Sequence, residues 1–188
     1  ICLAIRSGVC AGIIVHNQLY RGASESAGEI GHMVVDRNGP RCFCGNRGCL
    51  QQLVTGPAII ARAGKRISGG EKTSLQGDKL SLEKIIGEAK KGDALSVTVL
   101  KETGKYIGLA VSPLIDFFNP QLIILAGNLV EAGELVLEPL KETVEKKALE
   151  IPRRTVRIAF SELGDNIGAL GAANLVLQEK FKFQFSQI

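Results

Sequence analysis

The segment Gly28–Cys49, GEIGHMVVDRNGPRCFCGNRGC, carries the most specific pattern in this 188-residue sequence. It places His32, Cys42, Cys44 and Cys49 at successive spacings of ten, two and five residues. Three thiolates and one imidazole are the ligand set of a closed tetrahedral zinc site, which leaves no position for a substrate water. The glycines of the segment give the backbone the freedom to wrap three thiolates around one ion. The pattern predicts a structural Zn²⁺ site.

Two other interpretations of these cysteines stay open, namely a disulfide bond and reduced thiols without a metal. Cys42 and Cys44 are too close in sequence to bridge each other easily, and three cysteines leave one unpaired. The remaining two, Cys2 and Cys10, lie in apolar segments and are expected in the core. Reduced cysteines indicate a reducing compartment, so we expect a cytoplasmic protein.

Composition excludes several classes of protein. The chain is 45% hydrophobic and 22% charged, with a net charge of +4, which is typical of a globular domain and not of a disordered one. The longest apolar candidate, residues 107–118, is interrupted by Ser112, Pro113 and Asp116, so no membrane partner is expected. The mild, mixed charge does not indicate nucleic-acid binding by this chain itself.

Apolar periodicity and turn residues predict the order of the elements. Strands are expected at 1–5, 29–35, 122–127 and 155–160, a turn at 7–12, a hairpin joining 13–15 to 19–20, irregular structure at 36–48, a polar loop at 68–79, and helices at 58–67, 82–92, 94–118, 133–149 and 167–181. In the tail, residues 181–185, apolar and polar side chains alternate, so this segment either forms a strand or docks against the rest of the chain as a lip. This order predicts an α/β fold with a mixed β-sheet flanked by helices.

The segments Gly28–His32 and Cys42–Cys49, with Gly39 between them, resemble the signature of the ROK family (repressor, open reading frame, kinase). Residues 12–22 resemble the hairpin before that signature and residues 169–173 the family's final helix, so the resemblance covers essentially the whole chain. It implies an actin-like (RNase H-like) fold of two lobes around a sugar-binding cleft. Residues 1–188 resemble the carboxy-terminal lobe, without the amino-terminal lobe that carries the kinases' catalytic aspartate.

The resemblance also implies sugar-binding residues. In the family, the Glu and His of the Glu-x-Gly-His motif and a Glu two residues after the last cysteine contact sugar hydroxyls; by position these are Glu29, His32 and Gln51. His32 would bind zinc through one ring nitrogen and face the sugar with the other. Gln51 lacks the family's carboxylate, a charge-assisted acceptor worth about 1–2 kcal/mol per bond. The alternative to a sugar-binding role for Glu29 is a carboxylate at the end of a strand that contacts only solvent.

The nucleotide-binding pattern of the family's kinases is incomplete here. Their Gly-Thr-Gly-x-Gly turn, which approaches ATP phosphates, matches Arg6–Cys10 (RSGVC), where the first and last residues replace glycines. A later double glycine appears as Ala126–Gly127. Ser7, Gly8 and Gly127 are therefore interpreted as remnants of a nucleotide site, and the substitutions argue against phosphoryl transfer.

The residues before the first cysteine of the cluster, Val34–Asp36 and Asn38–Pro40, resemble the repressor branch of the family, which includes the N-acetylglucosamine and xylose repressors. This resemblance implies a sugar or sugar-phosphate effector, assembly as a homodimer or homotetramer, and DNA contact only through an upstream region outside these residues. The alternative is an ATP- and Mg²⁺-dependent sugar kinase resembling glucokinases or N-acetylhexosamine kinases. A third interpretation is a structural lobe that keeps the zinc site but has lost sugar binding.

Overall fold

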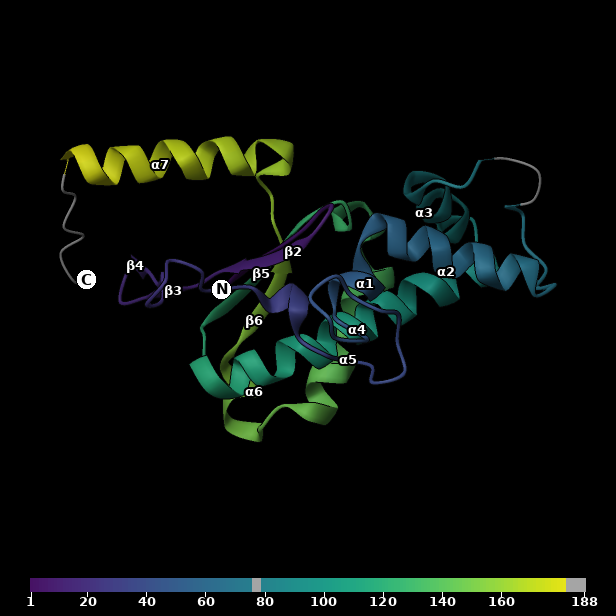
Figure 1. The fold of residues 1–188 in the computed structure, drawn as a ribbon, viewed down its shortest axis with the longest axis horizontal. Helices are drawn as coiled ribbons and strands as arrows, with labels where there is room; N and C mark the ends of the chain where they lie inside the picture. The colour runs from purple at the N-terminus through teal and green to yellow at the C-terminus, as the bar shows by residue number, and fades with distance from the viewer. Residues whose placement is uncertain (76–78, 182–188) are drawn as a thin grey trace.

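The computed structural model describes residues 1–75 and 79–181, and a four-stranded sheet in the order β2-β1-β5-β6 lies at its centre (Figure 1). β1 (Cys2–Ile5) pairs antiparallel with β2 (Val9–Gly12) and parallel with β5 (Leu122–Gly127). β5 in turn pairs parallel with β6 (Arg157–Phe160). The predicted α/β class with a mixed, helix-flanked sheet is confirmed.

The predicted hairpin and the five predicted helices are present, together with short helical segments that were not predicted. They are β3 (Ile14–Val15), β4 (Gln18–Leu19), the 3-10 helices η1 (Ile30–His32), η2 (Val130–Ala132) and η3 (Gly164–Asn166), and the helices α1 (Gln51–Val54), α2 (Gly56–Ser68), α3 (Leu82–Lys90), α4 (Ala94–Phe118), α5 (Glu134–Lys147), α6 (Glu150–Thr155) and α7 (Ile167–Phe181). The Asp93 carboxylate caps α4 by accepting a hydrogen bond from Ser96 N at 2.9 Å. Asn119, with a left-handed φ of 42°, ends that helix.

The core lies between the sheet and α4 and α5. Leu3 of β1, Ile123 of β5 and Ile107 of α4 are completely buried in one continuous apolar cluster. α4 and α5 approach closely because Gly104 has no side chain: a Cβ there would lie 2.3 Å from the Val136 carbonyl oxygen. Alternate residues of β1 and β5 therefore hold the helix pair against one face of the sheet.

α7 extends away from this body after β6 (Figure 1). None of its described side chains is buried, and Leu170, Leu175, Val176 and Leu177 are exposed. In the described part of the chain, no helix combines the length and apolar character needed to cross a membrane.

The predicted strand at 29–35 is wrong. Gly28 has φ +94°, the Ile30 N–H donates to the Gly28 carbonyl at 2.7 Å, and the chain then turns through η1. A Cβ on Gly31 would lie 2.4 Å from the Val9 carbonyl oxygen, so η1 lies directly against β2. Only a single β-bridge, between Val34 and Cys49, remains. Close packing on β2 overrides the alternating pattern.

Three smaller expectations also need correction. The turn predicted at 7–12 is confined to its first residues, because residues 9–12 pair with β1 as β2. The strand predicted from 155 begins at Arg157, because residues 150–155 form α6. Cys10 is exposed and Cys2 half-buried, so neither is a core thiol: both lie on the outer face of the sheet, opposite Leu3 and Ile5. The prediction for the tail falls, after Phe181, outside the described residues.

Candidate functional site

Four potential metal ligands converge beside η1. His32 ends η1, Cys42 and Cys44 lie on the turn between the bridged residues 41 and 47, and Cys49 precedes α1. Their ligand atoms all lie within 4.8 Å of one another. His32 Nδ1 is 3.6 Å from Cys42 Sγ, and Cys44 Sγ is 3.6 Å from Cys49 Sγ. The structure therefore brings all four predicted ligands together.

These separations fit a tetrahedral metal ion. With metal–sulfur bonds of about 2.3 Å and a metal–nitrogen bond of about 2.0–2.1 Å, the ligand atoms of a tetrahedral site lie roughly 3.5–3.8 Å apart. The sulfur–sulfur distance of 3.6 Å between Cys44 and Cys49 is far longer than the roughly 2.05 Å of a disulfide bond. The four residues can thus hold a metal ion in a closed site.

The thiols of the cluster differ in their readiness to lose a proton. A hydrogen bond from the backbone of Cys44, together with side-chain hydrogen bonds from Cys44, Cys49 and Gln51, lowers the pKa of Cys42 to about 6 although burial opposes it. Burial, followed by the neighbouring thiols, raises the pKa of Cys49 to about 12. The Cys42 thiol therefore loses its proton more readily than the Cys49 thiol, and a metal ion held by this cluster would bind both as thiolates.

Backbone hydrogen bonds hold the loop around the cluster. The Gly48 carbonyl accepts from Val35 N at 2.9 Å, and Gly48 N donates to the Pro40 carbonyl at 2.8 Å. Gly48 has φ +67°, and a Cβ there would lie 1.5 Å from the Asp36 carbonyl oxygen. Only glycine fits this position. The ring of Phe43 packs edge-on against His32, with the ring centroids 5.0 Å apart.

The three predicted sugar-binding residues lie near this cluster in different environments. Glu29 immediately precedes η1 and is exposed, and its carboxylate has no hydrogen-bond partner among the described residues. His32 is half-buried with Nδ1 on the metal side, which leaves Nε2 for a second partner. Gln51 is buried, and its Nε2 lies 3.4 Å from Cys42 Sγ. His32 thus belongs to the cluster and Gln51 contacts it, whereas Glu29 has no contact with it.

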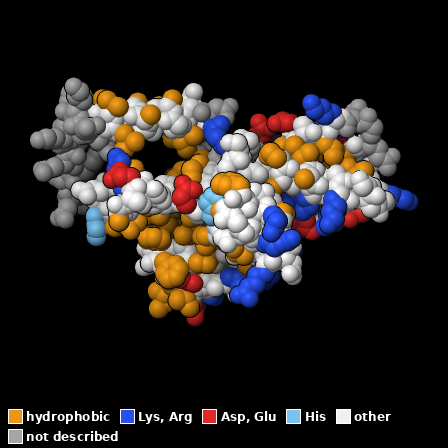
Figure 2. All heavy atoms as spheres, in the orientation of Figure 1, with side chains coloured by type: hydrophobic (Ala, Val, Ile, Leu, Met, Phe, Trp, Pro, Cys, Tyr) orange, Lys and Arg blue, Asp and Glu red, His pale blue; other side chains and the backbone are white. Residues whose placement is uncertain are grey.

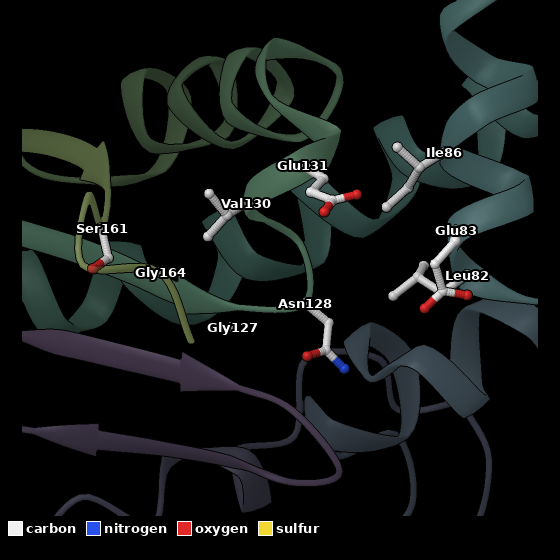
Figure 3. Close-up of a pocket in the computed structure, with 9 residues that line it drawn as sticks. All are labelled: Leu82, Glu83, Ile86, Gly127, Asn128, Val130, Glu131, Ser161 and Gly164. Carbon is white, nitrogen blue, oxygen red and sulfur yellow. The ribbon is translucent and has the colours of Figure 1, made fainter. Parts of the chain in front are cut away.

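Of the three predicted nucleotide-site residues, only Gly127 lines a cavity, although Ile5, at the start of the turn that holds Ser7 and Gly8, pairs with Gly127. Gly127 lines a cavity of about 340 Å³ at the carboxyl ends of β5 and β6 (Figure 3). Ser7 and Gly8 are not part of that lining; Gly8 faces Gln51, whose Oε1 lies 3.9 Å from the position of a Cβ on Gly8. The Arg6 side chain lies against Gly127, with Cγ 3.2 Å from the position of a Cβ there.

The cavity at Gly127 carries negative charge. Figure 3 shows the side chains of Glu83 and Glu131 facing the same space as the Asn128 amide. Hydrogen bonds from its own backbone and from Ser81 lower the pKa of Glu83, so that carboxylate is charged at neutral pH. Two carboxylates at this place oppose the binding of a polyphosphate by charge repulsion.

Two contributors to the site are absent from the sequence-based predictions. Gln52 Nε2 lies 3.8 Å from Cys42 Sγ. Arg62 of α2 donates to the Leu53 carbonyl at 2.7 Å and to the Val99 carbonyl at 3.1 Å, and so ties α1 to α4. The position of Arg62, three residues after Ile59 and next to Ala63 on the apolar side of the helix predicted at 58–67, was the available signal.

Comparisons with known proteins extend over nearly the whole chain. The sequence profile of the ROK family matches residues 1–179. The chain is 34% identical over 177 residues to the xylose repressor of Bacillus subtilis, covering 94% of this chain and 44% of that protein. It is 34% identical over 176 residues to the DNA-binding transcriptional dual regulator NagC of Escherichia coli, covering 94% and 43%. The chain spans less than half the length of these curated relatives.

Solved structures of both a regulator and a kinase have a similar fold. A ROK family transcriptional regulator, a homologue of the E. coli MLC protein, has a TM-score of 0.80 at 30% identity, covering 85% of this chain and 40% of that one. A ROK family glucokinase from Streptomyces griseus, in complex with glucose and AMPPNP, has a TM-score of 0.81 at 28% identity, covering 93% and 59%. The fold is therefore the actin-like fold of these proteins.

Proposed function

Because the chain belongs to the ROK family, we propose that residues 1–188 are the carboxy-terminal lobe of a sugar-responsive transcriptional regulator of carbohydrate utilisation in the cytoplasm. The observation that carries this proposal is the similarity to transcriptional repressors along nearly all of this chain. DNA contact belongs to a part of the regulator outside these residues. A sugar or sugar phosphate acts as effector and shifts the regulator between two conformations.

The effector binds beside η1 in this proposal. The Glu29 carboxylate is exposed and has no partner among the described residues, so it is available to accept hydrogen bonds from adjacent sugar hydroxyls. His32 and Gln51 supply further polar groups at the same place. A site built to bind hydroxyls discriminates strongly against analogues that lack them, because its polar groups are then left unpaired.

The metal ion in this proposal is Zn²⁺, held by His32, Cys42, Cys44 and Cys49. Three thiolates and one imidazole at the observed separations support zinc. All four protein ligands are used, so the ion has a structural role. It ties η1, the loop and the start of α1 together, which places His32 and Gln51 relative to Glu29.

The alternative is a sugar kinase, and the likeness to the S. griseus glucokinase supports it. Two features of the chain oppose it. The Arg6 side chain lies where the family's glycine turn exposes bare backbone to phosphates, against Gly127. Glu83 and Glu131 place two carboxylates in the cavity at Gly127, and ATP bound there would bring its own negative charges close to them.

We also propose that the regulator assembles as a homodimer or homotetramer. An apolar patch lies over the end of α4 and α6, at the lower edge of the view in Figure 2. Its most exposed members are Phe117 at 84% and Ile151 at 78%. The patch is formed by Phe117, Phe118, Leu122, Leu149 and Ile151.

The area and shape of this patch support a second copy of the chain as its partner. Five side chains this exposed present on the order of 500 Å² of apolar surface, close to the apolar share of a standard interface of about 800 Å² per partner. The patch also combines a protruding Phe117 ring with an adjoining hollow of about 350 Å³, beside Leu109 and Pro113. In a two-fold interface the same surface of each copy meets the other, so that surface must carry both a protruding group and the hollow that receives it.

Calorimetric titration of the full-length protein with hexoses, pentoses, N-acetylhexosamines and their phosphates tests the effector proposal. At least one of them should bind, and Glu29→Gln should weaken that binding about 10- to 100-fold through loss of a charged acceptor. A coupled assay for ADP release should show no turnover. Turnover of any sugar would establish the kinase instead, and absence of binding by wild type would leave a structural lobe.

A further inference from the structure

The outer side of the loop around the metal cluster is positively charged. Arg37, Arg41 and Arg47 are all exposed, and residues 37–47 include no aspartate or glutamate. The chain has 23 lysines and arginines, and the 20 that remain after these three are matched by 19 aspartates and glutamates. Most of the excess positive charge of the chain therefore lies on this one loop.

The three guanidinium groups have no acidic partner in the described part of the chain. Other arginines do, as in the pair of Arg66 with Glu71 at 3.0 Å. Arg41 and Arg47 also lie opposite each other in an antiparallel β-bridge, an arrangement in which like charges destabilise the pairing. The fold thus holds two positive charges side by side without an internal counter-charge.

An exposed aromatic ring lies on the same turn, between the two bridged arginines. Phe43 is 84% exposed, although burial of a phenyl ring lowers the free energy. Its edge-on contact with His32, at 5.0 Å between ring centroids, leaves most of the ring surface open. Arginine and aromatic side chains are the types that contribute most to binding at the centres of protein interfaces.

Backbone hydrogen bonds hold this surface in shape. Cys42 N donates to the Asn46 carbonyl at 2.8 Å, and Gly45 N donates to the Cys42 carbonyl at 3.1 Å. Cys42 itself is buried, whereas its neighbours Arg41 and Phe43 are exposed. Because the backbone of the turn is already ordered, little further conformational entropy is lost from it when a partner binds.

We propose that Arg37, Arg41, Phe43 and Arg47 form a docking surface for an acidic segment of another protein. Carboxylates of that segment accept paired hydrogen bonds from the guanidinium groups, and one of its apolar side chains covers the Phe43 ring. The partner supplies the counter-charge that the loop lacks. This surface is independent of the proposed effector site, because it includes none of the three residues assigned to the effector.

Charge and apolar area favour a protein partner over a nucleic acid or a membrane. Proteins that bind DNA through its backbone contact about 6–10 phosphates, which is more than three arginines on one loop can neutralise. Stable attachment to a membrane needs more apolar insertion than one phenyl ring provides. In a protein interface, by contrast, a few arginine and aromatic side chains carry most of the binding free energy.

Selection of displayed peptides on the full-length protein tests this docking surface without knowledge of the natural partner. Phage that display short random peptides are first depleted on the double variant Arg41→Glu/Arg47→Glu and are then selected on wild type. The enriched peptides should carry several aspartates or glutamates together with an aromatic or aliphatic residue. Failure to enrich any peptide, or enrichment of peptides without acidic residues, would overturn the inference.

Fluorescence anisotropy with an enriched peptide then measures what each side chain contributes. The double variant, Arg37→Glu and Phe43→Ser should each bind the peptide about tenfold more weakly than wild type, or weaker still. Added salt should weaken wild-type binding, because exposed ion pairs are screened. Arg157→Glu, which reverses the charge of an exposed arginine in β6, is the matched control and should bind like wild type. Peptide affinities of the loop variants within threefold of the control would refute the docking surface.

Circular dichroism and elemental analysis must show that each variant keeps the fold and metal content of wild type. Arg37→Glu lies outside the bridged turn, so it still tests the surface if the double variant does not fold. Random-sequence duplex DNA and vesicles that contain anionic lipid are the competing probes. If either binds wild type more tightly than the enriched peptides do, and the loop variants abolish that binding, the surface serves a nucleic acid or a membrane and the protein partner is wrong.

Discussion

Removing the metal ion should loosen the segment from His32 to Cys49 far more than the rest of the lobe. A metal ion held by His32, Cys42, Cys44 and Cys49 would cross-link the two ends of an 18-residue segment. Treated as a cross-link that restricts the unfolded chain, a loop of this length contributes about 3 kcal/mol. That value is a lower bound, because Cys42 and Cys44 divide the loop further and each bond to the ion adds its own binding energy.

Hydrogen exchange measured by mass spectrometry, with and without excess chelator, checks this magnitude. The amides of Val35, Cys42 and Gly48, which hydrogen-bond within the loop, should exchange roughly 100-fold faster without metal, since 1.4 kcal/mol corresponds to a factor of ten. Amides in the buried middle of α4 should change much less.

Elemental analysis must first establish that the chelator has removed the metal. If the fully demetallated protein then exchanges the loop amides within threefold of the loaded protein, the cross-link reasoning is wrong. The backbone hydrogen bonds of Gly48 would then be sufficient to hold the loop. A loss of protection spread evenly over α4 and the sheet would also contradict it, because the lobe would then unfold as one unit.

Three further predictions concern other parts of the lobe. Burial alone would raise the pKa of Asp93, but hydrogen bonds from Ser96, Ser74 and Thr73 lower it to about 2. Because the folded pKa lies below the unfolded value of about 3.9, this carboxylate stabilises the fold above pH 4, and that stabilisation is lost as the pH falls towards 2. Solvent screens this partly exposed group, so the loss should be about 1 kcal/mol. In chemical denaturation, the free energy of unfolding of Asp93→Asn should fall less steeply between pH 4 and 2 than that of wild type, and an equal fall would disprove this. Gly48→Ala should destabilise the lobe by at least about 2 kcal/mol and weaken zinc binding, because its Cβ would clash with Asp36 O. The control is Gly45→Ala, since Gly45 also has a positive φ but open space around it, and this change should cost only about 1 kcal/mol. Equal losses of stability in thermal melts of the two variants would show that the clash at Gly48 does not matter. Phe117→Ser should lower the oligomer mass measured by light scattering, whereas an unchanged mass would exclude the patch as an interface.

Local residue chemistry was sufficient to predict much of this fold. The buried run of β5, the Asp93 cap of α4 and the glycine and proline signals around α2 act over a few residues, so their elements follow from the sequence. The strand predicted at 29–35 failed because its alternation was judged without its neighbour. η1 is formed by the approach of Gly28 and Gly31 to the backbone of β2, a contact between segments that the pattern of one segment cannot reveal.

By itself, the sequence predicted the four candidate metal ligands, because one histidine and three cysteines within 18 residues form the ligand set of a tetrahedral site, and the structure brings these four residues together. Only the tertiary structure decided the role of the residues around that cluster. In the structure, the Gln51 amide faces Cys42, Gly8 faces Gln51, and Gly127 lines a cavity that also contains the Glu83 and Glu131 carboxylates. The physical reason is that ligand identity is local chemistry, whereas orientation and charge environment are set by segments that meet only when the sheet and helices pack.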